Sequence, residues 1–171
     1  GNDLISAAAT NNSASVSTDG SVLLQAAGNI GSDSNRIEIA GASALAANAD
    51  SGSLWLRKLG ATDALQLGGV EAFNTGDNTG GSFALSYAGL TTGNAGNITL
   101  TTQGGDLTLI ENVAADTAGY VDLRTAGTGA VALNSGAQIT SGTGTLQILA
   151  GGVISTDSTT GTTTELATAG D

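Results

Sequence analysis

Short alternating triplets of hydrophobic and polar residues recur along the chain. The outer residues of each triplet are apolar and the central residue is often polar, as in residues 98–100 (ITL) and 107–109 (LTL). This period of two predicts short β-strands that bury one face and expose the other. The triplets begin at residues 22, 37, 54, 65, 83, 98, 107, 121, 131 and 146, and Gly, Asn, Asp and Ser are common between them.

From residue 98 onward, the spacings between triplets alternate between short and long. Successive triplets start 9, 14, 10 and 15 residues apart, so a pair of triplets repeats every 23 to 25 residues. A unit that recurs at about 20 to 50 residues is typical of solenoid proteins. The first half of the chain follows the unit less regularly. The sequence therefore predicts an all-β fold, a parallel β-solenoid with about six or seven coils of roughly 24 residues.

An antiparallel sandwich or barrel is the competing architecture, because strands about 8 to 12 residues apart would also suit hairpins. In that fold Gly104-Gly105 would be a hairpin tip, whereas in a solenoid it is a corner. We favour the solenoid because the spacings alternate as a pair, similar residues recur at similar places, and Gly or Asn at the corners tolerates positive φ. The predicted inward columns are Ile98, Val121 and Leu146, and Leu100, Leu123 and Ile148.

The composition adds that this chain is weakly charged and rich in small residues. It has 27 Gly, no Pro and 11% charged residues, against about 25% in an ordinary soluble domain. The net charge is −11, and the basic residues are Arg36, Arg57, Lys58 and Arg124. So few cations argue against a nucleic acid partner and against anionic membrane surfaces. No apolar run approaches the length of about 20 residues that a membrane span needs, so we expect no membrane insertion.

Catalytic chemistry has few candidate residues here. The chain contains no Cys and no His, which excludes disulfides, thiol chemistry and His or Cys metal sites. A nucleophilic Ser would lack its usual His base. We therefore expect no catalytic residues, no metal-binding residues and no cofactor.

Paired carboxylates would be the signature of a polysaccharide-cleaving β-helix. The predicted alignment stacks Asp122 between Thr99 and Gln147, with Arg124 two residues later, and it places Asp106 at a different corner. No predicted column carries two carboxylates in successive coils. We interpret these residues as isolated acids on an acidic surface.

Two further features allow more than one interpretation. The loop at residues 74–82 could hold a weak calcium site near Asp77, but it lacks EF-hand spacing and is more simply a flexible Gly-rich loop. Trp55 points outward by alternation, so it could stack on a sugar ring or lie under the 68–81 loop. Tyr87 and Tyr120 are weaker candidates for the same two roles.

The stretches GSVLLQAAGNIGSDSNRIEIAG, GNITLTTQGGDLTLIEN and GAVALNSGAQITSGTGTLQILAGGVI resemble the repetitive body of filamentous-haemagglutinin-like proteins, which are giant bacterial exoproteins and adhesins. The resemblance covers about residues 19 to 155. It implies a right-handed parallel β-helix in a fibre that lies outside the cell or on the bacterial surface. The family's secretion domain carries an Asn-Pro motif, which this Pro-free chain lacks, so the resemblance is to the shaft.

We expect residues 1–171 to form a single β-solenoid domain, either a segment of a longer protein or a stackable subunit. No amphipathic helix is predicted to cap either end, so the end coils would stack on neighbouring sequence or head-to-tail on a second copy. The expected function is a non-catalytic structural or adhesive one. The alternatives are a self-assembling filament subunit and a carbohydrate-active enzyme or polysaccharide-binding module. A host-cell surface or a polysaccharide is a further possible partner, and residues 57–82 are the expected displayed surface.

Overall fold

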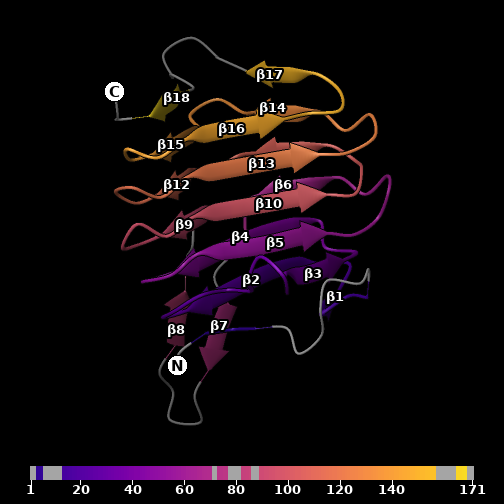
Figure 1. The fold of residues 1–171 in the computed structure, drawn as a ribbon. Helices are drawn as coiled ribbons and strands as arrows, with labels where there is room; N and C mark the ends of the chain where they lie inside the picture. The colour runs from indigo at the N-terminus through magenta and orange to yellow at the C-terminus, as the bar shows by residue number, and fades with distance from the viewer. Residues whose placement is uncertain are drawn as a thin grey trace.

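The structure is a computed structural model that describes residues 3–5, 13–70, 73–76, 82–85, 89–156 and 165–168, with 73–76, 82–85 and 165–168 described by their backbone. The chain winds as a right-handed parallel β-helix (Figure 1), which confirms the predicted fold class. One face is a six-stranded sheet, and its strands enclose about five turns, against the six or seven coils expected. In stacking order this first face contains β1 (Val16–Ser17), β3 (Ile37–Ala40), β5 (Leu54–Lys58), β10 (Ile98–Thr102), β13 (Val121–Thr125) and β16 (Leu146–Leu149).

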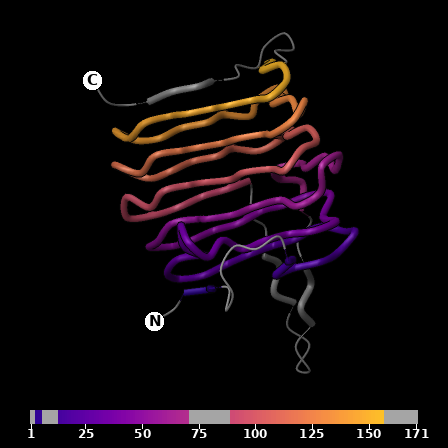
Figure 2. The backbone as a smooth tube through the Cα atoms, turned by 45° about the vertical axis from the view of Figure 1, so that its right-hand side comes forward, coloured from indigo at the N-terminus to yellow at the C-terminus, as the bar shows by residue number. Residues whose placement is uncertain are grey.

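The remaining coil strands form a second and a third face. The second face contains β6 (Leu65–Leu67), β11 (Leu107–Leu109), β14 (Val131–Leu133) and β17 (Ile154–Thr156), and the third contains β9 (Leu90–Thr92), β12 (Val113–Ala115), β15 (Gln138–Ser141) and β18 (Glu165–Thr168). In the early coils, β2 (Ser21–Ala26) and β4 (Ala44–Ala49) run across both faces, because β4 pairs with β6 at one end and with β9 at the other. Figure 2 shows these coils stacked in chain order.

The strand register confirms the predicted columns. Ile98 pairs with Val121, and Val121 pairs with Leu146. Hydrogen-bonded neighbours therefore lie 23 and 25 residues apart along the chain, and the hairpin alternative for residues 96–112 is wrong. Gly104 and Gly105 form a corner, as predicted. Gly105 has a φ of 73°, and a Cβ on either glycine would collide with the backbone of the coil below.

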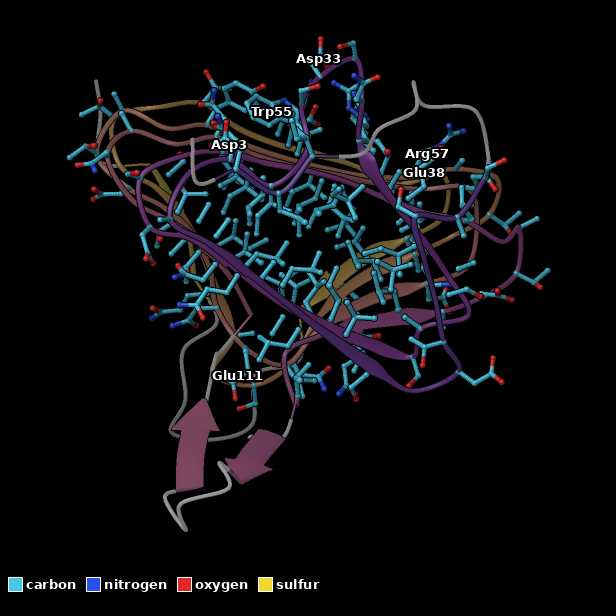
Figure 3. The ribbon with its side chains drawn as sticks, turned by 90° about the horizontal axis from the view of Figure 1, so that it is seen from below. Asp3, Asp33, Glu38, Trp55, Arg57 and Glu111 are labelled. Carbon is cyan, nitrogen blue, oxygen red and sulfur yellow. The ribbon has the colours of Figure 1, made fainter. Side chains whose placement is uncertain are left out.

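The interior is filled by aliphatic side chains from all three faces, as the view along the coils shows (Figure 3). Leu54, Ile98 and Val121 are each fully buried, and full burial of such a side chain stabilises the fold by about 1.5 to 3 kcal/mol. The last described rungs differ. Ile154 is 48% exposed although its paired residue Val131 is fully buried, because no further described coil covers it. Leu149 is 46% exposed because it pairs with Arg124 and points outward from the first face.

A hairpin interrupts the coil between β6 and β9. Its strands β7 (Phe73–Gly76) and β8 (Ser82–Leu85) pair antiparallel and project away from the body (Figures 1 and 3). The prediction that the triplet at 83–85 is a coil strand is therefore wrong. A short connection permits antiparallel pairing, whereas a parallel neighbour requires a long crossover. The expected displayed region, 57–82, is also only partly irregular, because it includes the end of β5 and all of β6.

Candidate functional site

Three of the chain's four basic residues lie on the outer side of the first face. Arg36, Arg57 and Arg124 line an open groove of about 880 Å³. Strand pairing places Arg57, Thr101 and Arg124 in one outward column. Adjacent strands are about 4.8 Å apart, so the Cα atoms of the two arginines are about 10 Å apart along the stack. The groove thus runs across the strands, parallel to the axis of the β-helix.

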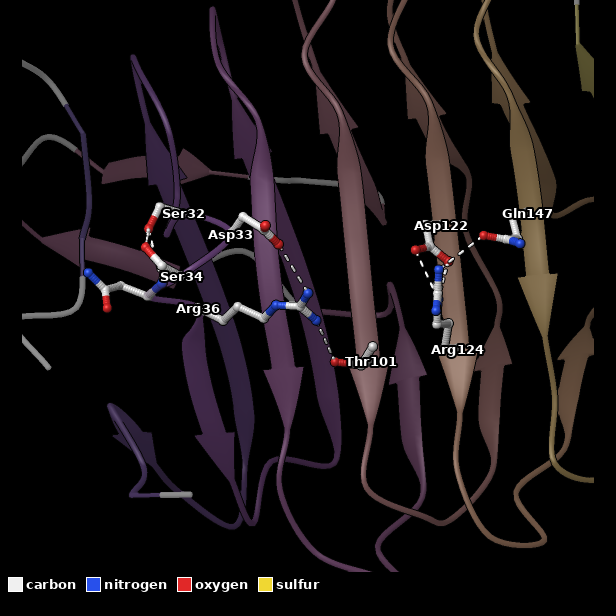
Figure 4. A network of polar contacts seen from close by, with 9 residues as sticks. Ser32, Asp33, Ser34, Arg36, Thr101, Asp122, Arg124 and Gln147 are labelled. Carbon is white, nitrogen blue, oxygen red and sulfur yellow. Dashed lines mark hydrogen bonds and ion pairs between the residues drawn. The ribbon is translucent and has the colours of Figure 1, made fainter. Parts of the chain in front are cut away.

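Arg36 reaches the groove from an insertion. Ile30 pairs with Leu54 and Ile37 pairs with Leu56, so residues 31–36 loop out opposite a single residue of β5. The loop begins at Gly31, whose φ is 76°. Its last residue, Arg36, then extends past β5, where Nη1 donates to Thr101 Oγ1 on β10 at 3.1 Å (Figure 4).

Each guanidinium in the groove also contacts a carboxylate. Nη2 of Arg36 lies 3.3 Å from Oδ1 of Asp33, whose side chain is 86% exposed. Nη1 of Arg57 lies 3.1 Å from Oε1 of Glu38, whose side chain is only 3% exposed. The first pair is open to solvent and contributes about 0 to 1 kcal/mol, while the second neutralises a buried acid.

Arg124 contacts side chains on its own strand and on the next one. Its Nε donates to both carboxylate oxygens of Asp122, at 2.7 and 2.9 Å, and its Nη2 donates to Gln147 Oε1 at 3.1 Å (Figure 4). Hydrogen bonding to Asp122 and the charge of that carboxylate raise the pKa of Arg124. The guanidinium is therefore charged at all ordinary pH values. Guanidinium groups bind carboxylates and other oxyanions through paired N–H donors.

The predicted acids occupy the expected separate positions. Asp122 stacks between Thr99 and Gln147, as predicted. Asp106 lies at another corner, where its Oδ1 accepts a hydrogen bond from the backbone N–H of Ala130 in the next coil at 2.8 Å. The structure thus brings Asp122 and Arg124 together and gives Asp106 a capping role.

Two of the aromatic candidates, Trp55 and Tyr120, lie on or next to the first face. Trp55 lies on the outer side of β5, half-buried, beside the 31–36 loop and on the side of the molecule opposite the hairpin (Figure 3). Tyr120 is 37% exposed and lines a smaller cavity with Asp122 and Arg124. Tyr87 and the possible calcium ligand Asp77 lie outside the described residues.

Lys58 is the basic residue that does not reach the groove. It points into the core and is fully buried, with Nζ donating to the carbonyl of Leu59 at 3.0 Å and lying 3.6 Å from Oδ2 of Asp63. Sequence reasoning missed this residue, although the alternation in 54–58 (LWLRK) places it on the same side as Leu54 and Leu56.

No group of three or more acidic side chains that could hold a metal ion is found in the described part of the chain. Among the same residues, no helix is long and apolar enough to cross a membrane.

Searches with protein-family models, of curated proteins and of solved structures found no significant match to the chain. The resemblance to filamentous-haemagglutinin-like proteins therefore stays a prediction that rests on the sequence stretches quoted above.

Proposed function

We propose that this chain is a stiff, non-catalytic segment of an extracellular bacterial fibre. The observation that supports this function is the in-register stack of β5, β10, β13 and β16, whose inward columns form a continuous aliphatic core. Each coil contributes one layer of backbone hydrogen bonds and one layer of aliphatic side chains. Bending such a stack would break both, so the fold is suited to a rod that carries load or displays loops.

A ladder of side-chain hydrogen bonds at one corner adds to this stiffness. Asn29 Oδ1 accepts from Ser53 N at 2.9 Å, Ser53 Oγ accepts from Asn97 N at 2.9 Å, and Asn97 Oδ1 accepts from Tyr120 N at 3.0 Å. Each of these side chains ties its own coil to the next one along the axis. The corner is therefore held by side chains as well as by the backbone.

The extracellular location rests on the sequence resemblance and can be tested directly. Antibodies raised against the purified chain should label surface fibres on intact source bacteria in immunogold electron microscopy. Antibodies against a cytoplasmic protein should label only permeabilised cells. If the antibodies against this chain also label only permeabilised cells, the proposal is contradicted.

A second candidate is a filament subunit that stacks head-to-tail. It is favoured by the apolar side chains exposed at the two ends of the described coils, where Ile5 is 62% exposed at one end and Val153 and Ile154 are 68% and 48% exposed at the other. A second copy could continue the parallel pairing and cover them. This contact would be heterologous and would build an open filament.

Sedimentation velocity over a range of concentrations tests the second candidate. Stacking predicts elongated oligomers that grow with concentration and disappear in a Val153→Asp, Ile154→Asp double variant. Ala118→Asp adds a charge at an exposed corner away from these residues and should leave the oligomers intact. A single monomer peak at the highest concentration would exclude stacking. The first candidate, a segment of a longer fibre, would then be favoured.

A further inference from the structure

We propose that the arginine groove binds a linear acidic polysaccharide whose sugar units carry carboxylates. The groove is the surface bounded by Arg36, Arg57, Thr101, Arg124 and Leu149, which come from successive coils of the first face. An occupant would lie along the axis of the β-helix and cross the strands. This inference does not depend on the proposed fibre function, because the groove exists in the isolated chain.

Charge distribution is the first argument. The chain carries a net charge of −11 and has four basic residues in total. Lys58 is fully buried, so every basic side chain that solvent can reach lies in this one groove. An anionic ligand would be repelled by most of the surface and attracted only here. The low number of cations also disfavours nucleic acids, which are bound through many phosphate contacts.

The carboxylates already present in the groove do not prevent a ligand carboxylate from binding the arginines. The Asp33–Arg36 pair is solvent-exposed, and such pairs contribute little, so a ligand carboxylate could replace Asp33 at small cost. Arg124 uses Nε and Nη2 in its contacts with Asp122 and Gln147, and its Nη1 has no partner among the described residues. The Arg57–Glu38 pair differs, because Glu38 is buried and needs its cation. Arg36 and Arg124 are therefore the residues expected to bind the ligand.

The neutral groups of the groove match a sugar chain rather than an isolated anion. Thr101 and Gln103 supply a hydroxyl group and an amide in the groove, and Gln147 supplies an amide in a neighbouring cavity beside Tyr120 and Asp122. Tyr120 is exposed where the smaller cavity continues the groove, since Arg36, Thr101 and Arg124 line both. Aromatic rings pack against the apolar faces of sugars. The spacing between rungs, about 4.8 Å, is also close to the length of one sugar unit in an extended chain.

Isothermal titration of the full chain with oligogalacturonate, at low and at high salt, tests this proposal. We expect binding that weakens with salt, and a loss of affinity of about tenfold or more in the Arg36→Ala, Arg124→Ala double variant. Neutral dextran should not bind. No binding of oligogalacturonate to the unaltered chain, or unchanged affinity in the double variant, would overturn the proposal.

A second variant keeps the test informative if the double variant folds poorly. Asp33→Asn removes the exposed competitor of the ligand and should increase affinity. Asp50→Asn makes the same charge change at an exposed residue that does not line the groove, so it should increase affinity less. Equal effects of the two changes would indicate a general charge effect and contradict a specific site.

Two further polymers decide the class of ligand. Dextran sulfate and single-stranded DNA carry sulfate and phosphate in place of carboxylate, and we expect both to bind more weakly than oligogalacturonate. Tighter binding of either polymer would overturn the assignment to a carboxylated glycan. None of these outcomes affects the surface-labelling test, so failure of the groove and failure of the fibre function can be told apart.

Discussion

Residues 98–141 and residues 21–92 follow the same coil but differ in regularity. In the later coils, β10 to β12 and β13 to β15 repeat one pattern of three short strands without an insertion. In the earlier coils, β4 runs across two faces, residues 31–36 loop out of the first face, and a hairpin follows β6. The later region stacks side chains into continuous columns, whereas the earlier region uses its irregularities to bring Arg36 and the hairpin to the surface. Regular coils thus provide the rod, and irregular coils provide its surface features.

The largest expected effect is the loss of a buried column residue in the regular coils. Leu100 is fully buried between Leu56 and Leu123 in the coils on either side. Leu100→Ala should lower the free energy of unfolding by about 2 to 5 kcal/mol, because rigid neighbouring layers cannot close the cavity. Urea denaturation followed by circular dichroism measures the change.

Leu149→Ala is the matched control for this substitution. The same atoms are removed from a side chain that is 46% exposed, so the loss should be well under half as large. Leu149 points outward, in register with Arg124, so equal losses for the two variants would show that burial in an inward column does not cause the loss at Leu100.

The next effect concerns the buried charge in the irregular region. Asp63→Asn removes the carboxylate that lies 3.6 Å from the buried Nζ of Lys58. Because a buried charge is then left without its counter-ion, we expect a loss of about 2 to 3 kcal/mol. Lys58→Met replaces the charge by an apolar side chain of similar length and should be neutral or stabilising. Thermal unfolding of both variants tests this, and a strongly destabilised Lys58→Met would assign the lysine a structural role that its contacts do not explain.

The same comparison shows how much the sequence could reveal. In the regular coils the strands of the first two faces, the inward columns, the corner at Gly104-Gly105 and the position of Asp122 were predicted, because period-2 alternation and a constant repeat specify register directly. The third-face strands β12 and β15 were missed, because neither carries the apolar–polar–apolar triplet of large side chains. The triplet at 83–85 follows the same alternation but belongs to the hairpin. Alternation identifies a strand and its faces, but it does not identify the neighbouring strand.

The groove could be predicted only in part. Arg57 and Arg124 share a column, but the hairpin increases the spacing between the paired residues Leu54 and Ile98 to 44 positions, which hides that column in the sequence. Arg36 depends on the path of the 31–36 loop, and no periodic pattern specifies a loop path. Functional side chains were therefore missed where the repeat is broken.

A smaller effect is expected at the corner where the regular coils meet the irregular one. Gly105 has a φ of 73°, and a Cβ there would also collide with the backbone carbonyl of Asp63. Gly127 has a φ of 63° but has open space around the position of a Cβ. Gly127→Ala should cost about 1 to 2 kcal/mol from the left-handed backbone conformation alone, and Gly105→Ala should cost more. Urea midpoints compare the two, and equal costs would mean that the lower coil moves to accommodate the new methyl group.

The smallest effect tests whether the corner ladder crosses from the irregular coils into the regular ones. Asn97 Oδ1 accepts a hydrogen bond from the N–H of Tyr120 in the next coil. Asn97→Ala should cost about 1 kcal/mol, because the backbone donor keeps only solvent as a partner. Asn134→Ala changes a corner asparagine whose side chain has no hydrogen-bond partner among the described residues, and it should cost less. Hydrogen exchange at the Tyr120 amide adds a local measurement, since protection should fall in Asn97→Ala and stay constant in Asn134→Ala. Unchanged protection in both variants would show that the backbone alone holds the corner, and the stiffness of the rod would then come from the strand pairing and the buried columns.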